Sequence, residues 1–363
     1  MSRTGIDLQT PPTSGDATVA VEKGIETGTP RYVVLKILVT GGAGYVGSHC
    51  VRALCDAGHL VVVYDNLVTG HLQAVDRRAR LIVADLADRD RLTRLFAEEA
   101  FDAVMHFAAS LDVGESVRDP LLYYRNNVGN TIGVLEAMRQ AGVRKLVFSS
   151  TCATYGIPPS LPIREKMPQH PINPYGRTKL AMEWALCDCA EAWGLGATAL
   201  RYFNAAGAAA DGTLGEHHHP EIHLIPLTLQ VALGQRAEIR IFGNDYATRD
   251  GTCVRDYVHV EDLASAHRLA VETQPEAMFR CYNVGTGHGS TVQEIVELAR
   301  YVTSHPIPAV MAARRPGDPP ELLADPSKLM AELGWRPEYT DTRRIIETAW
   351  NWHRAHPKGF QIK

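Results

Sequence analysis

The chain has 363 residues and a formal net charge of −4 at pH 7, with 45% hydrophobic and 21% charged residues. This length allows a large buried core, or two lobes that share an interface. The sequence holds no basic stripe that would follow a phosphate backbone, so we expect no nucleic-acid partner. It holds no apolar run near the ~20 residues that a helix needs to cross a bilayer, so we expect no membrane association.

Seven cysteines are scattered along the chain, and none has the C-x-x-C spacing of a metal or redox site. We interpret them as reduced thiols, which indicates a cytoplasmic protein. Residues 1–34 are rich in Thr, Gly, Pro and Asp and show no apolar periodicity, which predicts a disordered N-terminal tail. This tail lacks the apolar segment of a secretory signal, and its acidic residues argue against a transit peptide.

From Leu35 onward, short runs rich in β-branched residues alternate with helical patterns. Continuous apolar strands separated by helices are typical of a parallel sheet that is covered on both faces. The pattern predicts an α/β fold, with a Rossmann-type doubly wound parallel sheet over residues 35–206 that binds ligands at the carboxyl ends of its strands. The first helix is expected over 45–57, and strands are expected over 36–40, 59–64, 81–84, 103–107, 145–148 and 198–202.

After Asn204 the strands shorten, and Gly, Pro and His become frequent. This change predicts a smaller α/β substrate-binding lobe over residues 207–363. Segments near 255–285 are expected to cross back to the first domain, with residues 281–284 returning to the main sheet.

A glycine-rich turn follows the first predicted strand. Gly41, Gly44 and Gly47 form the spacing G-x-x-G-x-x-G at the start of a helix. Glycine permits the tight turn and lets backbone N–H groups approach a pyrophosphate. Asp65 ends the next strand, where a carboxylate accepts hydrogen bonds from the adenosine ribose and repels a 2′-phosphate. The pattern predicts NAD as cofactor in preference to NADP.

The stretch from Asn173 to Lys179 predicts a helix start that carries two reactive side chains. Asn173 is a favourable N-cap, and the next residue is a proline, which suits the first helical position. Tyr175 and Lys179 then lie four residues apart on one helix face. A nearby ammonium and the positive end of the helix dipole favour the phenolate, which predicts a general base near neutral pH. Just past the fifth strand, a hydroxyl of the run 149–151 can hydrogen-bond a substrate oxygen.

Together these residues carry a resemblance that extends from Leu35 to the C-terminus. The sequence resembles the extended short-chain dehydrogenase/reductase superfamily, and within it the UDP-glucose 4-epimerases. The segments that carry the resemblance are VTGGAGYVGSH, HFAA, VGESV, SSTCATYG, NPYGRTK, LRYFNAAGA, IFGNDYATRDGTCVRDYVHVEDLA, YNVGTG, RRPGD and LGW.

The resemblance implies a role for individual residues. Tyr175 would take the proton from the sugar 4-hydroxyl, Lys179 would bind the nicotinamide ribose, and Thr151 would hydrogen-bond the reacting oxygen. The NAD site would further comprise Gly41, Gly44, Tyr45, Val46, Gly47, Asp65, Asn66, Asp85, Leu86, Phe107, Ala108, Asn126 and Tyr202. The UDP-sugar would be bound by Phe203, Asn204, His223, Leu224, Arg255, Arg315, Asp318 and Leu322.

The implied reaction is the reversible inversion of C4 in a UDP-sugar such as UDP-glucose or UDP-galactose. Hydride passes from C4 to NAD⁺ while Tyr175 removes the hydroxyl proton, which gives a 4-keto sugar. The keto sugar then turns its other face to NADH while UDP stays anchored, and the NAD stays bound.

Three positions depart from the family's pattern. Leu111 stands where many relatives have a lysine that contacts the cofactor, and His223 stands where an asparagine is expected. Leu322 replaces a sugar-facing tyrosine of strict relatives. Two segments, SSTCATYG and GTCVRDY, also resemble those of UDP-pentose epimerases. UDP-xylose or UDP-arabinose, and UDP-N-acetylglucosamine, therefore remain alternative substrates.

Other classes of protein fit the residues less well. A sugar 4,6-dehydratase needs an acid/base pair directly after Thr151, where Cys152 and Ala153 stand. A dehydrogenase with net redox turnover is harder to exclude from residue types alone. A catalytically silent NAD-sensing protein would be expected to lose Tyr175 or Lys179, and both are present.

Two further features lie outside this chemistry. Residues 216–219 place three histidines after a glutamate in a Gly-rich loop, which we interpret as a solvated cluster, and we expect no metal. The helical stretches 121–138 and 180–193 are rich in apolar residues, which core packing explains. Because the resembling family uses these two helices for dimerisation, we expect a homodimer.

Overall fold

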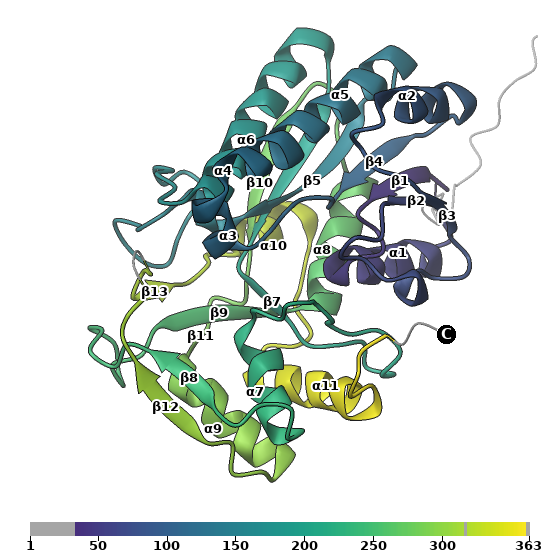
Figure 1. Ribbon diagram of the computed structural model, residues 1–363. Helices are drawn as coiled ribbons and strands as arrows, with labels where there is room; N and C mark the ends of the chain where they lie inside the picture. Colours follow the sequence, from purple (N-terminus) through teal and green to yellow (C-terminus); the bar gives the residue numbers. More distant parts are fainter. Residues whose placement is uncertain (1–32, 316–317, 361–363) are drawn as a thin grey trace, which may run out of the picture. The chain divides into compact units, whose positions relative to one another are not determined.

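A parallel sheet of seven strands is the main element of the computed structural model (Figure 1). The structure describes residues 33–315 and 318–360, so nearly all of the predicted tail over residues 1–34 lies outside the described residues. The strand order is β10-β6-β5-β4-β1-β2-β3, and every neighbouring pair is parallel. The strands are β1 (Lys36–Thr40), β2 (Leu60–Asp65), β3 (Arg80–Val83), β4 (Ala103–His106), β5 (Lys145–Thr151), β6 (Gly196–Tyr202) and β10 (Phe279–Val284).

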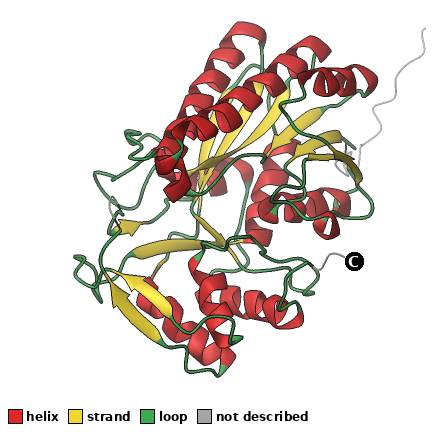
Figure 2. Cartoon of the chain, viewed as in Figure 1, coloured by secondary structure: helices red, strands yellow, loops and turns green. Residues whose placement is uncertain are grey.

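Helices flank this sheet on both faces, as Figure 2 shows in red against the yellow strands. Successive residues of β1 point to opposite faces: Ile37 and Val39 pack with helices α1 and α8, whereas Leu38 packs with α2, α5 and α6. Burial on both faces is the reason that the strands are apolar without alternation. The predicted Rossmann-type α/β fold is confirmed, and the predicted strands match the observed ones to within three residues at each end.

The helices begin where the sequence offers capping residues. The Asn173 side chain accepts a hydrogen bond from the backbone N–H of Gly176 at 2.8 Å, and α6 starts at Pro174. The α-helices are α1 (Tyr45–Asp56), α2 (Arg89–Glu98), α3 (Val113–Arg118), α4 (Pro120–Tyr123), α5 (Asn130–Ala141), α6 (Pro174–Trp193), α7 (Leu224–Ala232), α8 (Val260–Glu272), α9 (Val292–Thr303), α10 (Ser327–Leu333) and α11 (Thr342–Ala355). Shorter turns are η1 (Leu72–Ala74), the π-helix η2 (Tyr124–Gly129) and η3 (Cys152–Thr154).

The remaining strands form two smaller sheets. A four-stranded sheet contains β7 (Asn204–Ala206), β9 (Val254–His259), β11 (Gly289–Thr291) and β13 (Glu321–Leu322), and a parallel pair contains β8 (Ile239–Phe242) and β12 (Ala309–Ala312). Helices α7, α9 and α11 share a hydrophobic core with these strands. Strand β10, which contains residues 281–284, pairs instead with β6 of the main sheet. Residues Val34–Lys363 form one compact unit, and the division into lobes after residue 206 stays a prediction.

Among the residues that the structure describes, no helix is both long enough and apolar enough to span a membrane.

Candidate active site

Glycines shape the turn between β1 and α1. Gly41 has a φ of +74°, and a Cβ there would lie 2.5 Å from the backbone N of Ala108. A Cβ on Gly47 would lie 2.2 Å from the carbonyl oxygen of Gly41. Helix α1 begins after Gly44 with no side-chain cap and no acidic residue in its first turn. The turn therefore presents an uncapped, electropositive helix end that fits a phosphate group.

Asp65 lies beside this turn at the end of β2. Its buried carboxylate accepts hydrogen bonds from the backbone N–H groups of Ala43 at 3.0 Å and Leu67 at 2.9 Å. These bonds fix the carboxylate next to the glycine turn, where the adenosine ribose of a dinucleotide lies in this type of fold.

The other predicted cofactor residues lie at strand ends or on η2. Asn66, after β2, donates to the Asp85 carboxylate at 2.8 Å and so joins the ends of β2 and β3. Asn126, on η2, donates to the Ser110 hydroxyl at 2.9 Å, beyond the end of β4. The carboxyl ends of the strands thus gather most of the predicted set: Asn66, Asp85, Leu86, Phe107, Ala108, Asn126 and Tyr202, with Tyr45 and Val46 opening α1.

Thr151 and Tyr175 meet at the end of β5. Thr151 is the last residue of this strand, and its hydroxyl oxygen accepts a hydrogen bond from the backbone N–H of Ala153 at 3.1 Å. Tyr175 lies in the first turn of α6 and hydrogen-bonds the Thr151 side chain. The structure therefore brings together two of the three predicted catalytic residues.

Lys179, the third, lies one turn further along α6 and is buried. Its Nζ donates to the carbonyl oxygen of Ser149 at 2.8 Å and lies 4.9 Å from the centre of the Phe148 ring. Burial lowers the pKa of the Lys179 ammonium to about 7. The lysine is thus held against the last turn of β5 by a carbonyl and an aromatic ring.

The largest contributions to the Tyr175 pKa in the structure come from its burial and from groups other than Lys179. Burial raises the pKa of Tyr175 well above the ordinary value of a phenol, the neighbouring Tyr202 adds to this rise, and the hydrogen bond with Thr151 offsets only part of it. The physical reason is that the Lys179 ammonium is directed at the Ser149 carbonyl and is itself destabilised by burial. A positive charge beside the phenol would lower this pKa and favour ionisation.

A buried ion pair that the sequence analysis missed supports the catalytic helix. Glu183 follows Tyr175 by eight positions on α6 and binds Arg201 of β6 with an N···O distance of 2.5 Å. Both side chains are almost fully buried, at 2% and 4% exposure. The Ser150 hydroxyl also donates to Glu183, and Arg201 donates to the Tyr155 hydroxyl at 2.8 Å. An arginine inside the apolar run of β6 is the sequence signal that could have revealed this pair.

The predicted substrate residues form a polar and an apolar group. In the polar group, Arg255 of β9 donates to the Asp318 carboxylate at 2.6 Å. The exposed Arg315 places its guanidinium 4.1 Å from the centre of the Phe242 ring. Leu322 of β13 is the register partner of Arg255.

The apolar group surrounds Phe203. This ring is buried with Cys152, and Leu322 packs against the same cluster. Leu322 therefore contacts both the polar and the apolar group. Two other predicted substrate residues lie at the starts of elements: Asn204 is the first residue of β7, and Leu224 is the first residue of α7.

His223 is the exception among the predicted substrate residues. It precedes α7, and its imidazole contacts Glu216 and Glu221. The interpretation of the neighbouring histidines as a solvated cluster is wrong for His218, whose side chain is only 15% exposed because it packs against the buried Glu216. His219 is exposed, as expected.

Comparison with known proteins identifies the family. Residues 37–285 match the NAD dependent epimerase/dehydratase family. A UDP-glucose 4-epimerase of Lacticaseibacillus casei is 53% identical to the chain over 327 residues, which is 90% of this chain and 99% of that relative. The chain belongs to the NAD-dependent epimerase/dehydratase family.

Solved structures of similar proteins share the fold and hold the cofactor. The UDP-glucose 4-epimerase from Brucella ovis in complex with NAD is 48% identical, with a TM-score of 0.84 and coverage of 91% of this chain and all of that one. The Bifidobacterium longum enzyme in complex with NAD⁺ and UDP is 38% identical, with a TM-score of 0.86 and coverage of 90% and 100%. NAD is the cofactor of this family member, and the glycine turn, the uncapped α1 and Asp65 fit it.

The Glu183–Arg201 pair gives a prediction about stability. Glu183→Gln leaves the buried Arg201 charge without its anion, which should lower the free energy of unfolding by about 3–5 kcal/mol. Glu191→Gln, an exposed position on the same helix, is the matched control and should change the free energy by less than about 0.5 kcal/mol. Urea unfolding of both variants with saturating NAD measures the difference, and equal midpoints for the two would contradict the proposed role of the pair.

Proposed function

We propose that this family member catalyses the reversible C4 epimerisation of UDP-glucose and UDP-galactose through a 4-keto sugar. The observation that carries the proposal is the meeting of Tyr175 with Thr151 at the end of β5, with Lys179 one turn away. The similarity to curated UDP-glucose 4-epimerases over nearly their whole length supports it.

Tyr175 acts as the base that takes the proton of the 4-hydroxyl group. Thr151 hydrogen-bonds the same oxygen and orients it toward the phenol. When bound, NAD⁺ supplies the acceptor for the C4 hydride and a positively charged ring. That charge would lower the pKa of Tyr175 and so increase the fraction of phenolate that can accept the 4-hydroxyl proton. In the second half of the cycle, Tyr175 returns the proton to the oxygen of the inverted sugar.

The residues after Thr151 favour epimerisation over the dehydration that other family members perform. Cys152 is buried and Ala153 has no ionisable group, so these two positions supply no acid for elimination. Cys152 also lies in the apolar cluster of Phe203, where burial raises the pKa of its thiol to about 12 and keeps it protonated.

Arg255, Asp318 and Arg315 anchor the UDP part of the substrate. Arg255 is held by Asp318 and keeps further N–H donors for a phosphate or ribose oxygen, while Arg315 is exposed above Phe242. Because the substrate is anchored through UDP, the sugar is free to turn. The proposed reaction requires this rotation, since the hydride leaves one face of C4 and returns to the opposite face. Asn204, His223 and Leu224 complete the proposed substrate set.

The base assignment gives a direct prediction. Tyr175→Phe should lower kcat by at least ~10²-fold, the usual effect of losing a positioned acid/base, because the 4-hydroxyl proton then has no acceptor. NAD content and UDP affinity should stay unchanged, since the ring is retained. Activity within a few-fold of the wild type would contradict this role of Tyr175.

The apolar environment of Leu322 supports a wider sugar specificity. Leu322 packs with Phe203 where strict relatives place a tyrosine, and a leucine leaves more room for an N-acetyl group at C2. UDP-N-acetylglucosamine is therefore a second substrate in this proposal, and UDP-pentoses remain an alternative.

The specificity prediction compares two substitutions at this position. Leu322→Tyr should reduce kcat/KM for UDP-N-acetylglucosamine by about tenfold or more, because the tyrosine ring would crowd the N-acetyl group. A tenfold loss corresponds to a steric penalty of ~1.4 kcal/mol. The kcat/KM for UDP-glucose should change little. Leu322→Met keeps the side-chain volume and should leave the ratio of the two kcat/KM values unchanged. Equal losses for both sugars in Leu322→Tyr, or no turnover of the acetylated sugar by the wild type, would refute the prediction.

We also propose that the protein is a cytoplasmic homodimer that pairs through helices α4 to α6. Leu121 on α4 is 64% exposed, Ile132 on α5 is 41% exposed and Trp184 on α6 is 63% exposed. Large apolar side chains exposed on neighbouring helices mark a surface that a second copy can cover. The seven cysteines are free thiols, which fits a reducing compartment.

Trp184 provides the test of the dimer. Trp184→Glu should convert the dimer to a monomer in size-exclusion chromatography with light scattering, because it places a charge in the apolar interface. Tyr301→Glu changes an equally exposed aromatic residue on α9 and should leave the dimer intact. A dimer that persists in Trp184→Glu would place the interface elsewhere.

A further inference from the structure

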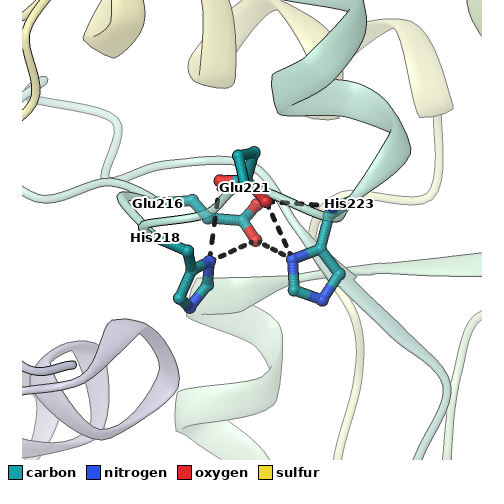
Figure 3. Close-up of side chains that lie close together, drawn as sticks. All are labelled: Glu216, His218, Glu221 and His223. Atoms are coloured by element: carbon teal, nitrogen blue, oxygen red, sulfur yellow. Dashed lines mark hydrogen bonds and ion pairs between the residues drawn. The ribbon is translucent and has the colours of Figure 1, made fainter. Parts of the chain in front are cut away.

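Four side chains of the loop between β7 and α7 converge on one point (Figure 3). They are Glu216, His218, Glu221 and His223, and each offers one ligand atom within 4.8 Å of the other three. Apart from His223, none of them belongs to the residues assigned above to the cofactor or the substrate. The spacing Glu-x-His-x-x-Glu-x-His brings two imidazoles and two carboxylates together.

We propose that this cluster binds one divalent transition-metal ion, with Zn²⁺ as the best fit. The Nδ1 atom of His218 lies 3.3 Å from Glu216 Oε1 and 3.6 Å from Glu221 Oε2. The Nδ1 atom of His223 lies 2.7 Å and 3.1 Å from oxygens of the same two carboxylates. Zinc ligands at about 2.0–2.1 Å in a tetrahedron are separated by about 3.3 Å, which these distances bracket.

The hydrogen-bonding pattern also indicates a shared ligand. Glu216 Oε1 and His218 Nδ1 are buried and make no hydrogen bond, although Oε1 lies 2.7 Å from His223 Nδ1 and 3.3 Å from His218 Nδ1. A buried polar atom without a partner is costly, and an unmodified ion pair would align N–H with oxygen. Lone pairs directed at a common centre satisfy both atoms at once when a cation occupies that centre.

The cluster is held in place by its surroundings. Glu216 is 3% exposed, and Glu221 Oε1 accepts hydrogen bonds from the backbone N–H groups of Ile222 and His223, both at 2.9 Å. The His218 ring packs edge-on against Tyr45, with ring centres 6.2 Å apart. A site whose ligands are already positioned loses little conformational entropy when it binds a metal.

The charge and the donor atoms select the class of metal. Once metal binding has displaced the protons from both imidazoles, the two carboxylates give the site a charge of −2, which one divalent ion neutralises. Imidazole nitrogens favour zinc and related transition metals over Mg²⁺ and Ca²⁺, which prefer oxygen ligands. Four protein ligands leave no open position, so the ion has a structural role.

The place of the site in the fold defines that role. Tyr45 begins α1 at the cofactor turn, and its hydroxyl donates to the Gly207 carbonyl at 2.7 Å. His223 immediately precedes α7. A metal ion on His218 and His223 therefore ties the first turn of α1 to the start of α7, and it leaves only Nε2 of His223 to meet a substrate.

The test measures metal content and affinity in the full-length protein without a histidine tag. Protein depleted of metal by chelation and titrated with ZnCl₂ should bind one Zn²⁺ per chain, and X-ray absorption should show four nitrogen and oxygen ligands without sulfur. His218→Gln and Glu216→Gln should weaken Zn²⁺ binding by at least about 100-fold. His219→Gln, the exposed neighbour, is the matched control and should bind like the wild type.

Far-UV circular dichroism and NAD content confirm that each variant is folded, and neither readout depends on epimerase activity. Failure of the zinc test therefore leaves the proposed function untouched. Absence of micromolar or tighter Zn²⁺ binding by the wild type, equal binding by His218→Gln, or a sulfur ligand in the absorption spectrum would each overturn the proposal.

Discussion

The position of helix α6 on strands β5 and β6 is the constraint on which the active site depends. Three residues four positions apart attach one face of α6 to the sheet: Tyr175 to Thr151, Lys179 to the Ser149 carbonyl, and Glu183 to Arg201. Because this spacing is about one helical turn, each attachment reinforces the register of the other two. A shift of α6 by one residue would break all three contacts and would separate the phenol from the threonine hydroxyl.

This arrangement also explains why Lys179 stabilises a Tyr175 phenolate less than the four-residue spacing between the two side chains suggests. A cation held against a carbonyl in a buried site is a positioning group, and burial lowers its own pKa. In the proposed mechanism, the ionisation of Tyr175 would follow the charge of the nicotinamide ring, which is positive when a hydride is to be accepted. Such a coupling would favour the phenolate in the half of the cycle in which the proton is removed.

Local sequence signals predicted most of the fold and the chemical centre. The glycine turn, Asp65 and the capped start of α6 are signals within a few residues, and the alternation of apolar strands with helices defined the sheet. The Glu183–Arg201 pair was missed, and the histidines after Glu216 were interpreted as solvated, because both features depend on tertiary packing. The position of Arg201 inside the apolar run of β6 signals a buried charge but does not name Glu183 as its partner. The spacing of Glu216, His218, Glu221 and His223 becomes informative only when the loop turns their side chains to one point. The burial that raises the Tyr175 pKa cannot be assessed from spacing either, and the role of Tyr175 as base stays a prediction.

In the proposed reaction, one enzyme-bound cofactor removes the C4 hydride and returns the same hydride to the opposite face. The most direct measurement is the conversion of UDP-glucose deuterated at C4, followed by proton NMR, by the purified protein without added NAD. Hydride return by the bound cofactor should give UDP-galactose that retains deuterium at C4, with no NADH released to solution. Loss of deuterium to solvent, or a requirement for stoichiometric added NAD, would contradict it.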